Sequence, residues 1–177
     1  VFPLLIKIID AKADLSIQVH PDDTYAAEHE KGSLGKMECW YILDCEPDSK
    51  LVIGHNAKDK AEVEKMIRNH EWSDFIRKVP VHKGDFFQIN PGCVHAIKGG
   101  TLILETQQSS DITYRIYDYK RVDDQGNERE LHTEQALDVI NFNASKKPKT
   151  VYTPLMNEVT PLVSCNYFTT NMLRFNK

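Results

Sequence analysis

Apolar and polar residues alternate in many short stretches of the chain, and this pattern predicts strands. In residues 14–20 (DLSIQVH) every second residue is apolar, as in a strand with one apolar face and one polar face. Many short strands separated by turn signals such as Asn90-Pro91-Gly92 favour a mainly β fold, either a sandwich or a barrel. The other predicted strands span 4–9, 37–43, 51–54, 86–89, 93–97, 101–108 and 112–119.

Residues 58–79 follow a helical pattern instead. Their apolar residues recur at the spacing of one helix face, first within 63–67 and again within 72–76. This predicts a small helical insertion of two short amphipathic helices, broken near Asn69-His70 and packed outside a sheet. Further helices are expected near 24–30 and over 132–142.

These elements divide the chain into three expected parts. Residues 1–125 form the β core with its insertion at 58–79, and residues 126–150 form a helix and a linker. Residues 151–177 begin a second unit. The chain opens with the apolar VFPLLIKIID and ends in strand-like residues, so we interpret both ends as cuts through a larger protein.

Composition and charge narrow the class of protein. The chain is 41% hydrophobic and 27% charged, ordinary values for a globular domain, and its net charge of −4 argues against a nucleic-acid partner. The apolar stretch 1–9 is too short to span a bilayer, so no membrane partner is expected. None of the four cysteines forms a C-x-x-C pair, which predicts reduced thiols in a cytoplasmic protein.

Three separate segments carry candidate metal ligands. Gln18 and His20 share one face of a strand, Glu38 opens an aromatic strand after a Gly-Lys turn, and His95 follows a tight Pro-Gly turn. Two imidazoles and a carboxylate suit a catalytic divalent metal with a position left open, and Gln18 offers a carbonyl oxygen. Taken singly, each residue is more often a core histidine or a solvated carboxylate. The other five histidines are expected at surface or loop positions.

Four segments carry a family resemblance: LSIQVHPDD (15–23), GKMECWYIL (35–43), GDFFQINPGCVHAI (84–97) and LETQQSSDITYRIYDY (104–119). In order and spacing they resemble the type I mannose-6-phosphate isomerases, most closely the short bacterial form, over roughly residues 1–142. The resemblance implies a cupin barrel, one zinc ion per chain, and interconversion of mannose 6-phosphate and fructose 6-phosphate. It also implies that 151–177 begins a second cupin-like part.

The resemblance assigns roles to individual residues. It implies zinc ligands at His20, Glu38 and His95, with Gln18 as a less uniform fourth. Arg115 matches the catalytic arginine and Lys36 a lysine of the substrate site. The second cupin motif departs from its usual pattern because Asn90 stands where a proline is common.

Several alternatives stay open from the sequence. A cupin oxygenase could hold iron on the same two histidines and carboxylate. A non-catalytic fragment could bind a sugar phosphate without turnover. Lys36 could be a solvated lysine and Arg115 a surface ion pair. The general base is unassigned, with Glu105 and a metal-bound water as candidates.

Overall fold

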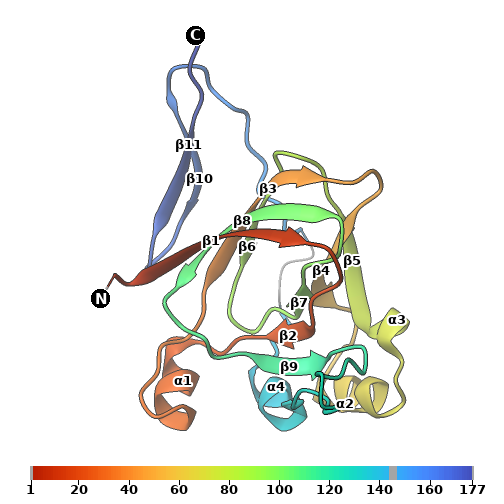
Figure 1. The fold of residues 1–177 in the computed structure, drawn as a ribbon. Helices are drawn as coiled ribbons and strands as arrows, with labels where there is room; N and C mark the ends of the chain where they lie inside the picture. Colours follow the sequence, from red (N-terminus) through yellow and green to blue (C-terminus); the bar gives the residue numbers. More distant parts are fainter. Residues whose placement is uncertain (1, 144–146, 177) are drawn as a thin grey trace.

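Two antiparallel sheets face each other and enclose the core of the molecule (Figure 1). The computed structural model describes residues 2–143 and 147–176. In the first sheet the strands lie in the order β1 (Leu4–Ala11), β8 (Thr101–Gln108), β3 (Glu38–Cys45) and β6 (Phe86–Ile89). The second sheet has the order β5 (Ile76–Pro80), β4 (Lys50–His55), β7 (His95–Ala96), β2 (Ile17–Val19) and β9 (Tyr114–Tyr117). The mainly β architecture predicted from the alternating pattern is confirmed.

The space between the sheets is filled by side chains from both of them. Trp40 and Ile103 of the first sheet pack with Leu51 and Ile53 of the second, and all four are at most 1% exposed. Because side chains alternate across a strand, the same inward face also carries polar residues near one end of the barrel. Those polar residues form the site described below.

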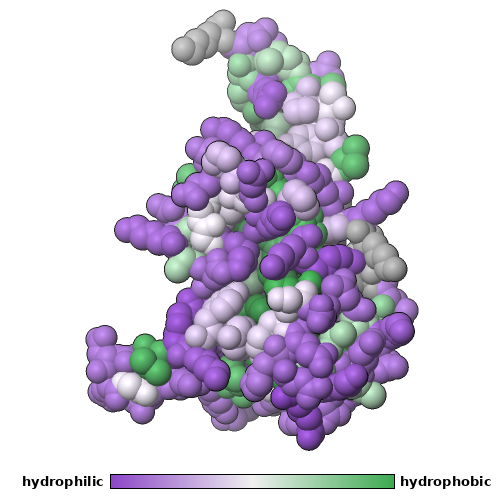
Figure 2. Space-filling model, turned by 90° about the vertical axis from the view of Figure 1, so that its right-hand side faces the viewer, coloured by the Kyte–Doolittle hydropathy of each residue, from purple (hydrophilic) through white to green (hydrophobic). Residues whose placement is uncertain are grey.

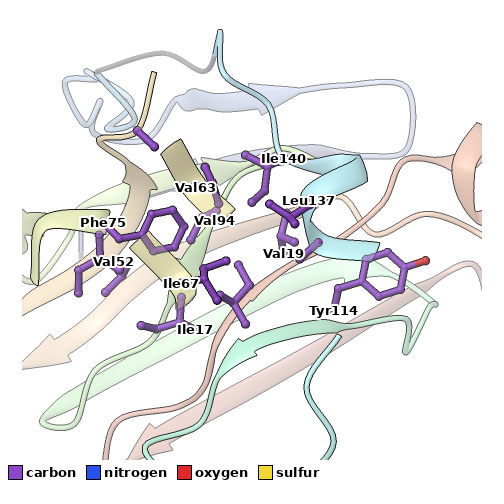
Figure 3. Packing of buried hydrophobic residues seen from close by; sticks show 14 of the residues in the cluster. Ile17, Val19, Val52, Val63, Ile67, Phe75, Val94, Tyr114, Leu137 and Ile140 are labelled. Atoms are coloured by element: carbon purple, nitrogen blue, oxygen red, sulfur yellow. The ribbon is translucent and has the colours of Figure 1, made fainter. Parts of the chain in front are cut away.

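Helices cover the outer face of the second sheet. They are α1 (Asp23–His29), α2 (Lys60–Arg68), α3 (Trp72–Phe75) and α4 (Thr133–Val139). Figure 3 shows side chains of α2 and α4, including Val63 and Leu137, packed with Val19 and Val94 of the sheet side. Residues 17, 19, 114 and 116 therefore point outward, which turns their strand neighbours at 18 and 115 toward the interior.

A hairpin covers part of the outer face of the first sheet. Its strands β10 (Val159–Ser164) and β11 (Thr169–Leu173) pair antiparallel, and Leu162, Val163 and Phe168 pack on Cys39 and Phe86. Beyond this contact the hairpin projects from the barrel (Figure 1). In Figure 2 the upper lobe, which carries the C-terminal end, shows hydrophobic residues beside a largely hydrophilic body.

The helices agree with the sequence pattern, with changes at their edges. The insertion is confirmed as α2 and α3, separated at Asn69-His70, where His70 adopts a φ of 57°. Its expected end at 79 is wrong, because residues 76–80 form strand β5 and pair with β4. The strands predicted at 93–97 and 112–119 shorten to β7 and β9. The described helices are all too short or too polar to cross a bilayer.

The division into 1–125, 126–150 and 151–177 stays a prediction. Residues 144–146 of the expected linker lie outside the described residues. The described part of 151–177 forms the hairpin that packs on the barrel.

Candidate metal centre

The predicted metal ligands lie together inside the barrel, because side chains two residues apart on a strand point to the same face. Gln18 pairs with His95 across β2 and β7, and His20 follows β2 on the same face as Gln18. Glu38 begins β3 in the opposite sheet, so its carboxylate approaches from the facing wall. The ligand atoms of His20, Glu38 and His95 all lie within 4.8 Å of one another, and each residue is 1% exposed. The predicted convergence of these three side chains is therefore observed.

The two imidazoles present the same nitrogen to the carboxylate. His20 Nε2 lies 3.3 Å from Glu38 Oε1, and His95 Nε2 lies 3.7 Å from Glu38 Oε2. Behind the rings, Nδ1 of His20 lies 2.9 Å from the Ile112 carbonyl oxygen, and Nδ1 of His95 lies 2.9 Å from that of Cys93. A carbonyl oxygen only accepts, so each Nδ1 carries the proton and donates it. In the neutral imidazoles, the Nε2 lone pair of His20 then faces Glu38, and that of His95 points between Glu38 and the Gln18 amide.

This arrangement fits a bound cation. Nε2 of His20 and both oxygens of Glu38 are buried, and among the described residues they have no hydrogen-bond partner of good geometry. Buried polar atoms are nearly always satisfied, and a lone pair directed at a carboxylate repels it. In proteins, donor sets of this kind, neutral imidazoles whose second nitrogen donates to a carbonyl together with a carboxylate, commonly bind divalent ions.

Electrostatics favour a charged Glu38 and a neutral His95. Burial by itself raises the pKa of Glu38, but its interactions with His20, His95 and Lys36 together outweigh burial, so this pKa lies far below its usual range. Burial lowers the pKa of His95 to about 4, and the charge of His20 acts in the same direction. A deprotonated carboxylate and a neutral imidazole are the forms that bind metals.

Gln18 and Lys36 lie at the edge of this cluster. The Gln18 amide Nε2 is 3.3 Å from His95 Nε2, and Gln18 Oε1 accepts a hydrogen bond from the Ser16 hydroxyl. Lys36 is 7% exposed, and its Nζ forms an ion pair with Glu38 Oε1 at 3.0 Å. The structure thus brings both sequence candidates to the three central residues.

A second carboxylate faces the same space from strand β8. Glu105 lies opposite Lys7 of β1 on one side and opposite Trp40 of β3 on the other. Its Oε1 accepts from Lys7 Nζ at 3.0 Å and its Oε2 from Trp40 Nε1 at 2.9 Å, and Lys7 also reaches Gln107. Lys7 was not among the site residues predicted from the sequence. The local pattern gave no signal for its inward position, because its apolar neighbours Ile6 and Ile8 are the exposed residues, at 59% and 71%.

These residues surround a small cavity of about 100 Å³. Its lining residues are Lys7, Ile9, Leu15, Gln18, Lys36, Glu38, Trp40, His95, Ile97 and Glu105. A larger hollow of about 440 Å³ lies elsewhere, next to His55 and Arg77. The smaller cavity is the functional candidate because it adjoins the three candidate metal ligands, and the size of the larger hollow alone does not indicate a function.

Arg115 stands apart from this cavity. It pairs with Gln18 across β2 and β9, so its side chain leaves the strand on the inward face. Its guanidinium, however, donates from Nη1 to the Glu130 carbonyl oxygen at 2.8 Å. Burial and the nearby Arg129 lower its pKa. Among the described residues that line the cavity, Arg115 is absent.

Comparisons with known proteins connect this site to a family. The family model for the catalytic domain of type I phosphomannose isomerase matches residues 1–44. The mannose-6-phosphate isomerase ManA of Bacillus subtilis is 50% identical over 169 residues, which cover 94% of this chain and 54% of that protein. The mannose-6-phosphate isomerase of Streptococcus mutans is 49% identical over 170 residues. The chain is a homologue of the type I phosphomannose isomerases.

Solved structures agree with this relationship. The mannose 6-phosphate isomerase of Bacillus subtilis superposes with a TM-score of 0.88 at 42% identity, covering 95% of this chain and 54% of that one. A phosphomannose isomerase variant from Salmonella typhimurium shares the fold, with a TM-score of 0.69 at 12% identity. The cupin fold predicted from the motifs is confirmed. The chain spans about half the length of the curated relatives it matches.

Proposed function

We propose that this chain carries the site of a metal-dependent aldose–ketose isomerase that interconverts mannose 6-phosphate and fructose 6-phosphate. The observation that carries the proposal is the buried group of His20, Glu38 and His95, whose ligand atoms lie within 4.8 Å of one another beside a cavity. Identity near 50% to mannose-6-phosphate isomerases supports the choice of substrate.

We assign His20, Glu38 and His95 as the residues that hold the metal, with the Gln18 amide oxygen as a fourth group. Zinc is the proposed ion, because two imidazoles and one carboxylate form a common catalytic zinc set with a position left open. When bound, zinc would supply a Lewis acid toward the carbonyl and hydroxyl oxygens of the sugar. Nε2 of His95 now accepts from the Gln18 amide, so that amide must turn for its oxygen to contribute.

Glu105 is the proposed carrier of the proton. The reaction removes the hydrogen on C2 of the aldose and returns it to C1, while a hydroxyl proton passes from O2 to O1, through an enediol. Lys7 and Trp40 each occupy one oxygen of Glu105 at 3.0 and 2.9 Å, which fixes the plane of the carboxylate at the cavity wall. A general base needs such a fixed position within reach of the proton that it abstracts.

The two cationic candidates differ in their proposed contacts. Lys36 Nζ lies 3.0 Å from Glu38 in the buried part of the site, which favours a contact with a sugar hydroxyl near the reacting carbons over one with the phosphate. Arg115 is the proposed stabiliser of enediolate charge. From its present position its guanidinium must exchange the Glu130 carbonyl for the substrate.

The size of the cavity restricts how the substrate would bind. A volume of about 100 Å³ is well below the roughly 300 Å³ at the lower end of ordinary ligand pockets. The reacting end of the sugar would therefore enter the cavity while the phosphate stays outside its rim.

Metal analysis and a coupled isomerase assay test the proposal together. Purified chain is expected to contain one zinc ion and to convert mannose 6-phosphate. The variant His95→Ala should lose both, whereas His82→Ala, at a side chain that is 78% exposed, should keep both. Full zinc content in His95→Ala would reject the metal centre. Iron in place of zinc, without isomerase activity, would favour a cupin oxygenase, and zinc without turnover a binding fragment.

A further inference from the structure

The loop that leads into strand β3 is held by an unusual number of contacts. It runs from Lys31 to Met37 and carries Lys36, and Glu38 follows directly as the first residue of β3. The amides of three consecutive residues each have a partner in the 21–23 turn or in Gln108. The Lys36 amide donates to the Pro21 carbonyl oxygen at 3.1 Å, and the Met37 amide donates to Gln108 Oε1 at 2.8 Å.

The third amide is held by Asp23, the first residue of α1. Its Oδ1 accepts from the Gly35 amide at 2.8 Å and from Gln108 Nε2 at 3.0 Å. The same oxygen therefore holds the loop directly and also holds Gln108, which accepts from the Met37 amide. Its Oδ2 accepts from the Tyr167 hydroxyl at 2.8 Å, across 144 residues of sequence. Three donors on one carboxylate lower the pKa of Asp23 although its partial burial acts in the opposite direction.

Close packing at Gly35 leaves the loop little freedom. A Cβ at this position would lie 2.4 Å from the Asp22 carbonyl carbon and 2.5 Å from the Asp23 amide nitrogen. The backbone of the loop therefore lies directly against the start of α1. A small displacement of this contact would move Lys36 and Glu38, because they follow within three residues.

Tyr167 brings the hairpin into this arrangement. It lies in the turn between β10 and β11, which Cys165 closes by donating its amide to the Phe168 carbonyl oxygen at 3.0 Å. Its bond to Asp23 raises the pKa of Tyr167 to about 12, with burial adding to the effect. Cys39 of β3 also contacts Thr170 of the hairpin, at 3.7 Å between Sγ and Oγ1.

From these contacts we infer that Asp23 is a positioning residue that fixes Lys36 and Glu38 in the metal centre, and that Tyr167 of the hairpin supports it. Asp23 touches neither ligand atoms nor cavity, so it acts through the Gly35–Met37 backbone. The role of Asp23 in catalysis rests on the proposed function. The hydrogen bonds that hold the loop can be measured in the metal-free chain.

The test compares variants of the 177-residue chain by amide hydrogen exchange and by zinc competition with a chromophoric chelator. In Asp23→Ala, exchange of the Gly35 and Met37 amides should accelerate at least about tenfold, and the zinc dissociation constant should rise about tenfold or more, as for loss of a partner that orients a ligand. In Asp23→Asn the amide oxygen can still accept from Gly35 and Gln108 while its NH₂ faces Tyr167, so both quantities should stay within about threefold of wild type.

A matched control separates positioning from helix stability. Asp22 caps α1 by accepting from the Tyr25 amide at 2.9 Å. Asp22→Ala should lower thermal stability while leaving Gly35 exchange and zinc affinity nearly unchanged. Tyr167→Phe should give an intermediate acceleration of exchange at Gly35.

The outcomes distinguish this inference from the proposed function. If the wild-type chain binds no zinc, the metal centre fails, and exchange at Gly35 still decides the role of Asp23. If Asp23→Ala leaves exchange and zinc affinity within about twofold of wild type, Asp23 is not a positioning residue. If Asp23→Ala does not fold, Tyr167→Phe takes its place, and unchanged Gly35 exchange in that variant would overturn the inference as well.

Discussion

Two buried carboxylates of this molecule have opposite surroundings. Asp118, 4% exposed, accepts from both Arg121 and Arg129, and the Arg129 fork binds both of its oxygens at 2.7 Å. Glu38, 1% exposed, faces two imidazole nitrogens at 3.3 and 3.7 Å and one lysine, without a hydrogen bond of good geometry among the described residues. Burial alone does not distinguish them.

The difference teaches how to separate a structural carboxylate from a functional one. Asp118 is satisfied by the protein itself, so its charge stabilises the loop that follows β9. The protein supplies too few hydrogen-bond donors to the buried oxygens of Glu38. This lowers the stability of the folded chain unless a cation binds. Each prediction below changes one side of this contrast, or changes Arg115, which pairs with Gln18 across the sheet and interacts with the charge of Asp118.

Replacement of Glu38 by Gln is expected to have the largest effect. The variant keeps the shape of the side chain and removes its charge, so zinc affinity should fall by more than about 100-fold, beyond the loss caused by removing an outer partner. The metal-free chain should keep its stability within about 1 kcal/mol, because the buried charge lacks full compensation. Zinc competition and urea unfolding in a chelating buffer measure the two quantities. Unchanged zinc affinity would place Glu38 with the structural carboxylates.

Replacement of Arg115 by Ala tests whether this arginine serves the metal centre around Glu38 or only stabilises the structure around Asp118. A donor that stabilises developing charge supplies about 100- to 1000-fold in turnover, so kcat for mannose 6-phosphate should fall by that factor while zinc content stays the same. Arg115→Lys, which keeps the charge but not the fork, should recover part of the loss. An unchanged kcat with lower stability would assign Arg115 to the Asp118 cluster.

Replacement of Asp118 by Asn should affect stability instead of the metal. The variant weakens the hydrogen bonds from Arg121 and Arg129. Because these side chains are 41% and 53% exposed, water can hydrogen-bond to them and partly compensate for the lost stability. The free energy of unfolding should fall by about 2 kcal/mol in urea titrations. Zinc affinity should stay near the wild-type value. The control Asp124→Asn, at an exposed position of the same loop, should change stability by about 0.5 kcal/mol or less.

The smallest expected effect is on the pH dependence of the free energy of unfolding, and it reports specifically on the ionisation of Asp118. The arginine contacts hold the pKa of Asp118 below its ordinary value of 3.8, against the opposing effect of burial. A carboxyl group with a lowered folded-state pKa contributes stability above its unfolded-state pKa and loses it as the pH falls through the folded-state value. The stability difference between wild type and Asp118→Asn should therefore be constant near neutral pH and shrink below about pH 4. A difference that grows on acidification would contradict the assignment.

Local patterns predicted the features that depend on local geometry. The two-residue period gave the strands, and it correctly placed Gln18 and His20 on the same face of one strand. The turns before Glu38 and His95 correctly indicated residues delivered to the ends of strands. Glu38 then meets both histidines because the two sheets face each other, a relationship that the family resemblance supplied and the residue pattern alone did not.

Features that depend on register or loop conformation were not predictable. Lys7 meets Glu105 because β1 pairs with β8 at a separation of 98 residues, and no local signal encodes that register. The guanidinium of Arg115 turns to the Glu130 carbonyl because of the path of the loop after β9. The limit of the helical insertion was wrong because residues 76–80 continue an amphipathic pattern while they pair with β4.

The carbonyl groups behind His20 and His95 have a consequence for tolerance to mutation. Main-chain oxygens of Ile112 and Cys93 select the ring tautomers, so no side chain has to be retained for that purpose. Positions 93 and 112 are therefore free to vary among apolar residues, provided that the backbone keeps its path. The tautomers of the two imidazoles are therefore determined by the backbone of the fold and not by the identity of the neighbouring side chains.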